Sequence, residues 1–252
     1  MSQSRNGSRK PQTYYELSRT LTYSAAAVLP LLVLYEVGVW WLNFGSPAGV
    51  RNAADVALKE PFMLLGPYGQ HAFVGLLFLG IVAIYRFETV PKRIRLIKPY
   101  FVLMFAESCV YALLFGGVIN FLLGSLFRIP FLAPGMESLD APARFILSLG
   151  AGLYEELVFR VILVSALFFF LRQGMGARPV PAYIAAVFLG AFLFSAYHYV
   201  GSMADAFSLH SFLYRFLAGL ILNVLFIARG FGIVVYTHAL YDVLVTVLLP
   251  GG

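Results

Sequence analysis

The sequence predicts an all-α protein, a polytopic bundle of about seven to eight transmembrane helices. Hydrophobic residues make up 60% of the 252 positions, only 12% are charged, and the mean hydropathy is +0.82. Ordinary soluble domains carry about 25% charged residues, because a water-soluble fold needs a polar shell. The apolar surface of this chain therefore requires lipid as its solvent.

Seven apolar runs are each close to the length of about 20 residues that a helix needs to cross a bilayer. They are 20–44, 71–85, 100–123, 144–171, 181–199, 211–228 and 231–249. The first run is too long for the apolar part of a signal peptide and lacks a clear cleavage site, so we expect an uncleaved helix. Only Arg229 and Gly230 separate the last two runs, which predicts a tight turn.

We divide the chain into a polar tail, 1–19, and one membrane domain, 20–252, whose motif-bearing core is about 100–249. We expect loops at 45–70 and 124–143, which are rich in Pro and Gly but contain too little polar sequence for a separate domain. Cys109, the only cysteine, lies inside an apolar run, which excludes an intramolecular disulfide and a CxxC-type metal site.

The distribution of Lys and Arg predicts the orientation, because positive charges near helix ends resist translocation. With the N-terminus inside, the cytoplasmic segments collect Arg5, Arg9, Lys10, Arg86, Lys92, Arg93, Arg95, Lys98, Arg172, Arg178 and Arg229. The opposite side holds only Arg51, Lys59, Arg128 and Arg144, mixed with acidic residues. We therefore expect a cytoplasmic N-terminus and an external C-terminus. The net charge of +6 does not indicate nucleic-acid binding, because the basic residues form no aromatic-interleaved face.

Ionisable side chains at bilayer depth are costly unless they are paired or lie in a wet cavity, so each one needs an explanation. The set is Glu36, Glu107, Glu155, Glu156, Arg160, His198, His238 and Asp242, with Arg215 near a helix end. Glu36 and Glu107 each stand alone in early runs. We interpret both as structural hydrogen-bonding or cavity-lining groups.

The densest cluster lies in the middle of the run 144–171. Glu156 and Arg160 are four residues apart, so they share one helical face and can form an ion pair. Glu155 points about 100° away from that pair and needs another partner. Either it belongs to the same structural network or it does chemistry, since one Arg cannot easily satisfy two carboxylates in a low-dielectric site.

Two histidines and an aspartate accompany this cluster. His198 ends the run 181–199 and taken alone is typical of an interfacial or core histidine, whereas His238 and Asp242 lie four apart on one face of the last run. Together with Glu155 they suit a hydrolase, in which the Glu acts as general base toward water and the histidines position the water and stabilise the oxyanion. The same four residues are a plausible zinc set with a water completing it, although the HExxH pattern is absent.

Three motifs in this order resemble the CPBP (Abi) family of intramembrane proteases, which includes the type II CAAX prenyl proteases and bacterial relatives named for bacteriocin immunity. The family pattern is EExxxR, FxxxH and HxxxN or HxxxD, each on its own membrane helix. Here the motifs run from Glu155 and Glu156 to Arg160, from Phe194 to His198, and from His238 to Asp242. The resemblance covers the chain from about residue 100 onward.

The resemblance implies an intramembrane endopeptidase that cleaves a membrane-associated or lipidated protein, in a bacterial cytoplasmic membrane. It implies that Glu155 activates the water, that His198 and His238 bind the water or stabilise the oxyanion, and that Asp242 occupies a position often held by Asn. Glu156 and Arg160 would support the site structurally.

The cofactor stays open, because the family has been described both as metal-dependent and as a glutamate-type protease. Asp242 adds a negative charge that repels an ionised Glu155 in an empty site, yet favours a cation or doubly protonated histidines. We expect no obligatory metal, with a divalent ion such as zinc as the alternative.

Two other functions are compatible with the same buried charges. A proton-coupled transporter would use the intramembrane carboxylates, although carriers often show internal repeats and broken helices, and we find neither. A non-catalytic scaffold or immunity factor could keep the fold. One geometric tension remains for the protease: we expect His198 near the outer end of its helix and Glu155 and His238 nearer mid-membrane, which helix tilt can reconcile.

Overall fold

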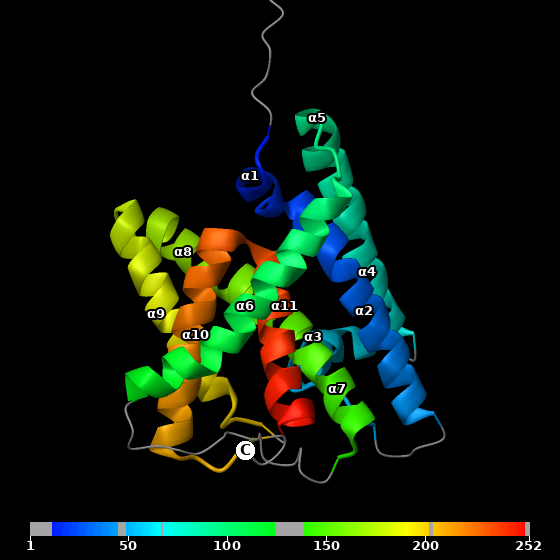
Figure 1. Cartoon of the computed structure of the whole chain (residues 1–252), viewed down its shortest axis with the longest axis vertical. Coiled ribbons are helices and arrows are strands. Elements are labelled where there is room, and N and C mark those ends of the chain that lie inside the picture. The colour runs from blue at the N-terminus through cyan, green and yellow to red at the C-terminus, as the bar shows by residue number, and fades with distance from the viewer. Residues whose placement is uncertain (1–11, 45–48, 67, 124–138, 202–203, 250–252) are drawn as a thin grey trace, which may run out of the picture.

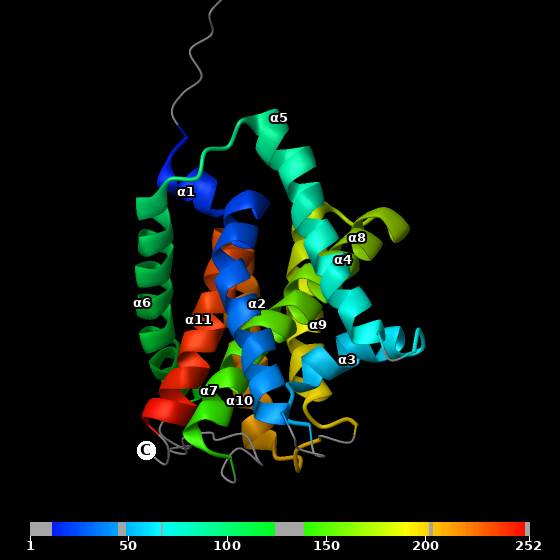
Figure 2. The same cartoon turned by 90° about the vertical axis from the view of Figure 1, so that its right-hand side faces the viewer.

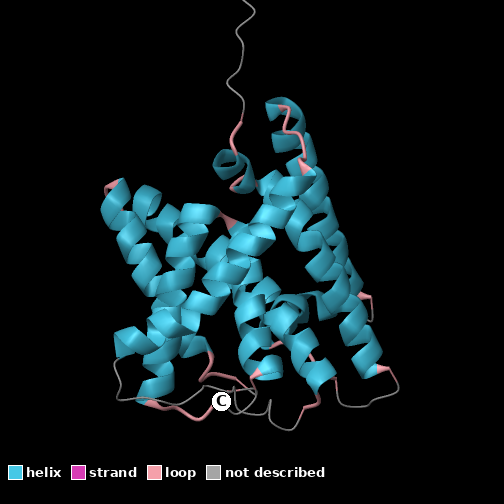
Figure 3. Cartoon of the chain, viewed as in Figure 1, coloured by secondary structure: helices cyan, strands magenta, loops and turns pink. Residues whose placement is uncertain are grey.

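The computed structural model describes residues 12–44, 49–66, 68–123, 139–201 and 204–249. All regular secondary structure in these ranges is helical, and they contain no strand (Figure 3). The predicted all-α fold class is therefore confirmed.

The described chain forms the following elements, labelled in Figure 1. They are α1 (Tyr14–Ser18), α2 (Leu21–Asn43), α3 (Ala53–Met63), α4 (Gly69–Ile84), η1 (Tyr85–Thr89), α5 (Val90–Lys92), α6 (Lys98–Leu123), α7 (Ala141–Gly150), η2 (Ala151–Glu155), η3 (Leu157–Val164), α8 (Ser165–Phe169), η4 (Phe170–Gly174), α9 (Pro179–Tyr197), α10 (Leu209–Arg229), α11 (Phe231–Val243) and η5 (Leu244–Leu248). Elements written η are π-helical turns that continue their α-helical neighbours.

Six helices of the described chain are long and apolar enough to cross a membrane. They are Leu21–Asn43, His71–Lys92, Lys98–Leu123, Pro179–Tyr197, Leu209–Arg229 and Phe231–Leu248. Each coincides with a predicted apolar run. The remaining predicted run, 144–171, lies on the unbroken helical stretch from α7 to η4, which carries three charged residues in its middle. The protein is thus a polytopic integral membrane bundle.

Successive spans run in opposite directions through the bundle. Figures 1 and 2 show α1 and α5 at one end of the molecule, and the last turn of the chain, η5, at the other end. Because the number of crossings is odd when α7 to η4 is included, the two termini of the described chain lie on opposite faces of the bundle.

The segment 45–70, which we expected to be a loop, contains the helix α3. Its first residues are capped by the side chain of Asn52, whose Oδ1 accepts hydrogen bonds from the backbone N–H groups of Ala54 (2.8 Å) and Asp55 (3.4 Å). The helix has 11 residues, including Pro61. It is therefore too short to cross a membrane. Figure 2 shows α3 set at an angle to the spanning helices.

The predicted tail, 1–19, contains a second short helix, α1. Thr13 and Glu16 form a reciprocal capping box at its start, a pattern of Thr and Glu three positions apart that marks helix N-termini. The helix contacts both α2 and α6. This part of the N-terminal segment is therefore packed onto the membrane bundle.

Glu107 ties α1 to α6 and α10. Both of its oxygens accept hydrogen bonds from Arg229, at 2.5 and 2.7 Å, and the hydroxyls of Tyr14 (2.6 Å) and Tyr111 (2.9 Å) also donate to it. Burial and the neighbouring carboxylate raise the pKa of the Tyr14 hydroxyl. The structural role expected for Glu107 is confirmed. Arg229, which we interpreted as a topology signal, is in addition a buried partner of this carboxylate.

The helix α11 occupies the centre of the bundle. It packs against α6, η2, α7, α2 and α10, and its residues Ile233, Val234 and Val235 are all fully buried. Close approach to η2 depends on Gly152, since a Cβ at this position would lie 2.6 Å from the Cβ of Ala239 and 2.7 Å from its backbone nitrogen. The missing side chain lets the helix that carries the paired glutamates reach the helix that carries His238.

Replacing Gly152 with Ala should lower the free energy of unfolding by about 1–3 kcal/mol, because the added methyl meets backbone atoms that cannot move aside. The measurement is reversible unfolding in detergent micelles. Gly117→Ala on α6 is the control, since nothing lies within 4 Å of a Cβ there. Equal unfolding curves for the two variants would contradict the proposed close packing of η2 on α11.

Candidate active site

The residues of the three motifs come from the three helical elements that meet at the centre of the bundle. Glu155 ends η2 and Glu156 follows it, His198 caps the C-terminal end of α9, and His238 and Asp242 lie on α11. The helix α9 packs on η3 and α11 packs on η2. The packing therefore brings together residues that are up to 87 positions apart in the chain (242 − 155).

Glu156 is the centre of a buried charge cluster. Its Oε1 lies 3.0 Å from an Nη of Arg160 and 2.7 Å from Nδ1 of His238, and the side chains of Glu156 and Arg160 are both 0% exposed. The guanidinium also lies over the ring of Phe194, 4.5 Å from its centroid. The structure thus contains the ion pair that the spacing predicts. It adds a contact with His238 that the sequence did not reveal.

His238 has a carboxylate at each ring nitrogen. Nδ1 faces Glu156 at 2.7 Å, and Nε2 lies 3.5 Å from Oδ2 of Asp242. A doubly protonated imidazolium can donate to both carboxylates at once, whereas a neutral ring can donate to only one. The arrangement therefore suits a cationic His238 held in a fixed orientation.

Glu155 has a different environment from its neighbour. It is partly exposed, and its Oε1 accepts a hydrogen bond from the side-chain amide of Asn52 at 3.1 Å. It lies within electrostatic range of His198, His238 and Asp242. The hydrogen bond of Glu155 thus goes to Asn52, whereas the ion pair of Arg160 goes to Glu156.

His198 is oriented by its own helix. Its Nδ1 lies 2.9 Å from the backbone oxygen of Phe194, so this nitrogen donates a proton to the carbonyl and Nε2 of the neutral ring is an acceptor. The ring of Phe194 lies 5.0 Å from the ring of His198 and 6.4 Å from that of His238. The FxxxH spacing thus places one aromatic ring beside both imidazoles. Glu155 lies within electrostatic range of His198, although we expected the two residues at different depths.

The four candidate residues do not form a metal site in this arrangement. Among the described residues, no three His, Cys, Asp or Glu side chains are placed to hold a metal ion. Both nitrogens of His238 face carboxylates and Nδ1 of His198 faces a carbonyl, which is a hydrogen-bonding geometry rather than a set of converging ligands.

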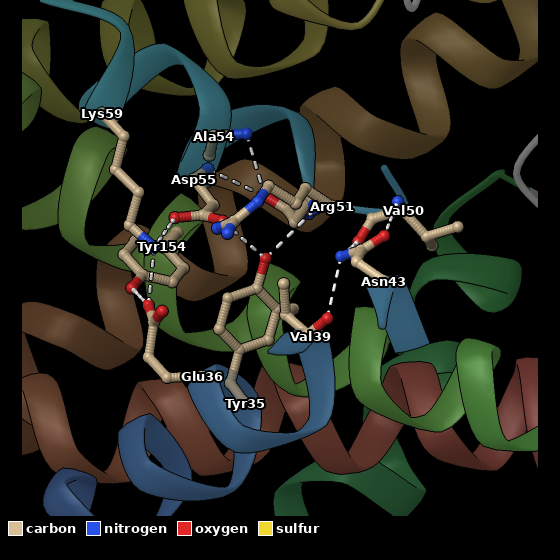
Figure 4. A network of polar contacts seen from close by, with 11 residues as sticks. Tyr35, Glu36, Val39, Asn43, Val50, Arg51, Ala54, Asp55, Lys59 and Tyr154 are labelled. Carbon is tan, nitrogen blue, oxygen red and sulfur yellow. Dashed lines mark hydrogen bonds and ion pairs between the residues drawn. The ribbon is translucent and has the colours of Figure 1, made fainter. Parts of the chain in front are cut away.

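A second polar network surrounds α3 beside the site (Figure 4). Lys59 lies 2.7 Å from Glu36 and 2.6 Å from Asp55, and the hydroxyl of Tyr154 donates to Glu36. Asp55, which is 0% exposed, also accepts from Arg51 at 2.9 Å. We call these five residues the α3 network. The structural hydrogen-bonding role expected for Glu36 is confirmed.

The remaining charge that the sequence singled out, Arg215, lies on α10 outside the cluster around Glu155. It pairs with Asp205, in the segment between α9 and α10, and its guanidinium lies 5.3 Å from the ring centroid of Tyr199. This contact links the chain that follows His198 to α10.

A largely apolar cavity of about 610 Å³ lies within the membrane-spanning part of the protein. Its walls come from α2, α4, the helix from η2 to α8, α9, and the junction of α10 with α11, and they include Val28, Leu77, Gly80, Leu157 and Val161. The cavity also touches Tyr154, the residue before Glu155. The wall therefore includes a sequence neighbour of Glu155 but none of the charged residues of the three motifs.

These observations define a polytopic helical membrane protein with a cluster of carboxylates and histidines at its centre. Residues 137–244, which contain all three motifs, match the family model described as type II CAAX prenyl endopeptidase Rce1-like. This match supports the family resemblance that the three motifs predict. Searches among curated proteins and among solved structures gave no significant match.

Removing the charge of Arg160 tests the buried cluster. Arg160→Met leaves Glu156 without its guanidinium and should lower the free energy of unfolding by about 3–5 kcal/mol. The double variant Glu156→Gln/Arg160→Met should recover part of this loss, because no unpaired ion remains. The measurement is unfolding of purified protein in detergent.

Lys92→Met is the matched control, since Lys92 also pairs with a Glu four positions away but is 60% exposed. Its loss should be less than about 1 kcal/mol. A double variant less stable than Arg160→Met would argue against the charge cluster as the origin of the effect.

Proposed function

We propose that the protein is an intramembrane endopeptidase in which Glu155 activates the attacking water. The proposal rests on the different burial and partners of the two neighbouring glutamates. Glu156 is fully buried against Arg160 and His238, whereas Glu155 is partly exposed, accepts its hydrogen bond from a neutral amide and lies within electrostatic range of both histidines. Glu155 is therefore the carboxylate that is available to take a proton from water.

In the proposed reaction, Glu155 removes a proton from water as the water oxygen bonds to the carbonyl carbon of the scissile peptide. The negative charge that forms on the carbonyl oxygen is stabilised by a cationic His238, which Glu156 and Asp242 hold in place. Nε2 of His198, an acceptor, takes a hydrogen bond from the attacking water. The carbon–nitrogen bond then breaks, and the proton held by Glu155 passes to the leaving amine. Water is consumed, and a carboxyl and an amino group are produced.

The proposed substrate is a membrane-associated or lipidated protein or peptide. The cavity supports this assignment, because it is apolar, lies among the membrane spans and reaches Tyr154 beside Glu155. We further propose that the end of the bundle formed by α1 and α5 faces the cytoplasm of a bacterial cell. The charges Arg86, Lys92, Arg93 and Arg95 lie at or near α5 and support this orientation.

Glu155→Gln should reduce cleavage by about 10²- to 10⁴-fold, because glutamine cannot accept the proton of the water. Purified wild type and variant are compared on a panel of membrane-anchored and lipidated peptides. Glu16→Gln is the control, since glutamine can replace glutamate in the capping box of α1.

A Glu155→Gln variant with wild-type cleavage would refute the proposed base. Full biological complementation by an inactive variant would favour a scaffold, and flux of a solute driven by a proton gradient in proteoliposomes would favour a transporter.

Filling the cavity should slow cleavage of lipidated peptides more than cleavage of peptides without a lipid. Gly80→Phe projects a ring into the cavity without a steric clash at Cβ, since nothing lies within 4 Å of that position. We expect a rise in KM for the lipidated peptide. Gly75→Phe, on the same helix and equally open but not part of the cavity wall, should leave KM unchanged. Equal effects of the two variants would contradict a role of the cavity in substrate binding.

A further inference from the structure

We propose that Asn52, the residue that caps α3, positions Glu155 for catalysis, so that α3 is part of the active site. The inference rests on the proposed function of Glu155. Its starting point is the hydrogen bond from Nδ2 of Asn52 to Oε1 of Glu155, at 3.1 Å, between residues 103 positions apart. Asn52 lies outside the segment 137–244 that matches the family.

The orientation of the Asn52 amide is fixed by the start of α3. Its Oδ1 accepts from the backbone N–H groups of Ala54 and Asp55, at 2.8 and 3.4 Å. Because the oxygen is used as the helix cap, the amide nitrogen must be the atom that faces Glu155. The backbone N–H of Asn52 donates to the hydroxyl of Tyr35 at 3.2 Å, which fixes the backbone as well.

The helix α3 is itself anchored on the residues that precede the two catalytic candidates. Tyr154, directly before Glu155, donates to Glu36, which also binds Lys59 of α3 (Figure 4). Tyr197, directly before His198, donates to the backbone oxygen of Ala53 at 3.3 Å. The cap of α3 is therefore held between the helix of Glu155 and the helix of His198.

Buried charges make this attachment rigid. Asp55 is 0% exposed and pairs with Arg51 and Lys59, and the hydroxyl of Tyr35 donates to it at 2.9 Å. Asp55 cannot leave these partners without exposing an unpaired ion to a low-dielectric surrounding. The Asn52 amide is thus pre-organised toward Glu155 and does not need to be ordered by substrate.

A neutral amide is suited to the task of holding a general base. It fixes the direction of one carboxylate oxygen and leaves the other free for water, and it adds no positive charge that would weaken the base. Asn52, at the start of α3, thus supplies the hydrogen-bond partner that Glu155 lacks on its own helix.

The experiment compares Asn52→Ser and Asn52→Asp with wild type in cleavage of a prenylated, fluorescence-quenched peptide by purified protein. Both replacements keep an oxygen that caps α3, and both remove the amide donor. Asn52→Ser should lower kcat about 10- to 100-fold with little change in KM, because Glu155 loses its fixed position. Asn52→Asp should also move the acidic limb of the pH–activity profile to higher pH, because two facing carboxylates favour protonation.

Asn43→Ser is the matched control. Asn43 also ties α2 to the chain before α3, through hydrogen bonds with the backbone oxygen and nitrogen of Val50, and it does not touch Glu155. Its replacement should leave the pH–activity profile unchanged. A wild-type profile for Asn52→Asp together with wild-type kcat for Asn52→Ser would overturn the inference.

Glu155→Gln in the same assay separates the two proposals. If Glu155→Gln is inactive while the Asn52 variants are fully active, only the role of Asn52 is refuted. If Glu155→Gln is active, the proposed function is refuted. A readout independent of activity is the unfolding midpoint of Asn52→Ser, Glu155→Ala and the double variant, since alanine, unlike glutamine, has no oxygen that accepts from Asn52. Non-additive shifts support the contact, and additive shifts contradict it.

Discussion

The structure depends on one interaction, the placement of Glu156 between Arg160 and His238. A guanidinium buried at bilayer depth must have an anion beside it, and Glu156 supplies that anion four residues away on the same helix. The same oxygen binds Nδ1 of His238, which fixes the helix from α7 to η4 against α11. Glu156 has both partners, while its neighbour Glu155 accepts a hydrogen bond from Asn52 at the start of α3. The different surroundings of the adjacent glutamates therefore follow from which of them pairs with the arginine.

The features that the sequence predicts are local ones. The membrane spans follow from runs of apolar residues, and the Glu156–Arg160 pair follows from a spacing of four on a helix. The contact of Glu156 with His238 joins residues 82 positions apart, and no periodicity in one sequence encodes it. The same is true of Arg229, whose position at a helix end predicted a topology signal, whereas its side chain reaches Glu107 across 122 positions.

The helix α3 was missed for a different reason. Its 11 residues lie in a Pro- and Gly-containing segment between two spans, where hydropathy predicts only a loop. Asn52 directly before an Ala-Ala-Asp sequence is a helix-start pattern that could have revealed it. Even so, the partner of Asn52 is 103 residues away. The part of the site contributed by the first 100 residues therefore required the structure.

The most direct test of this account is the free energy of unfolding of Glu155→Gln beside that of Glu156→Gln, measured in detergent on the same day and with cleavage assayed in parallel. The two substitutions are chemically identical and one position apart. The account predicts that Glu156→Gln is markedly less stable than wild type, since Arg160 loses its counter-ion, while Glu155→Gln unfolds like wild type and is inactive. A stable Glu156→Gln beside an unstable Glu155→Gln would contradict the assignment of the two glutamates.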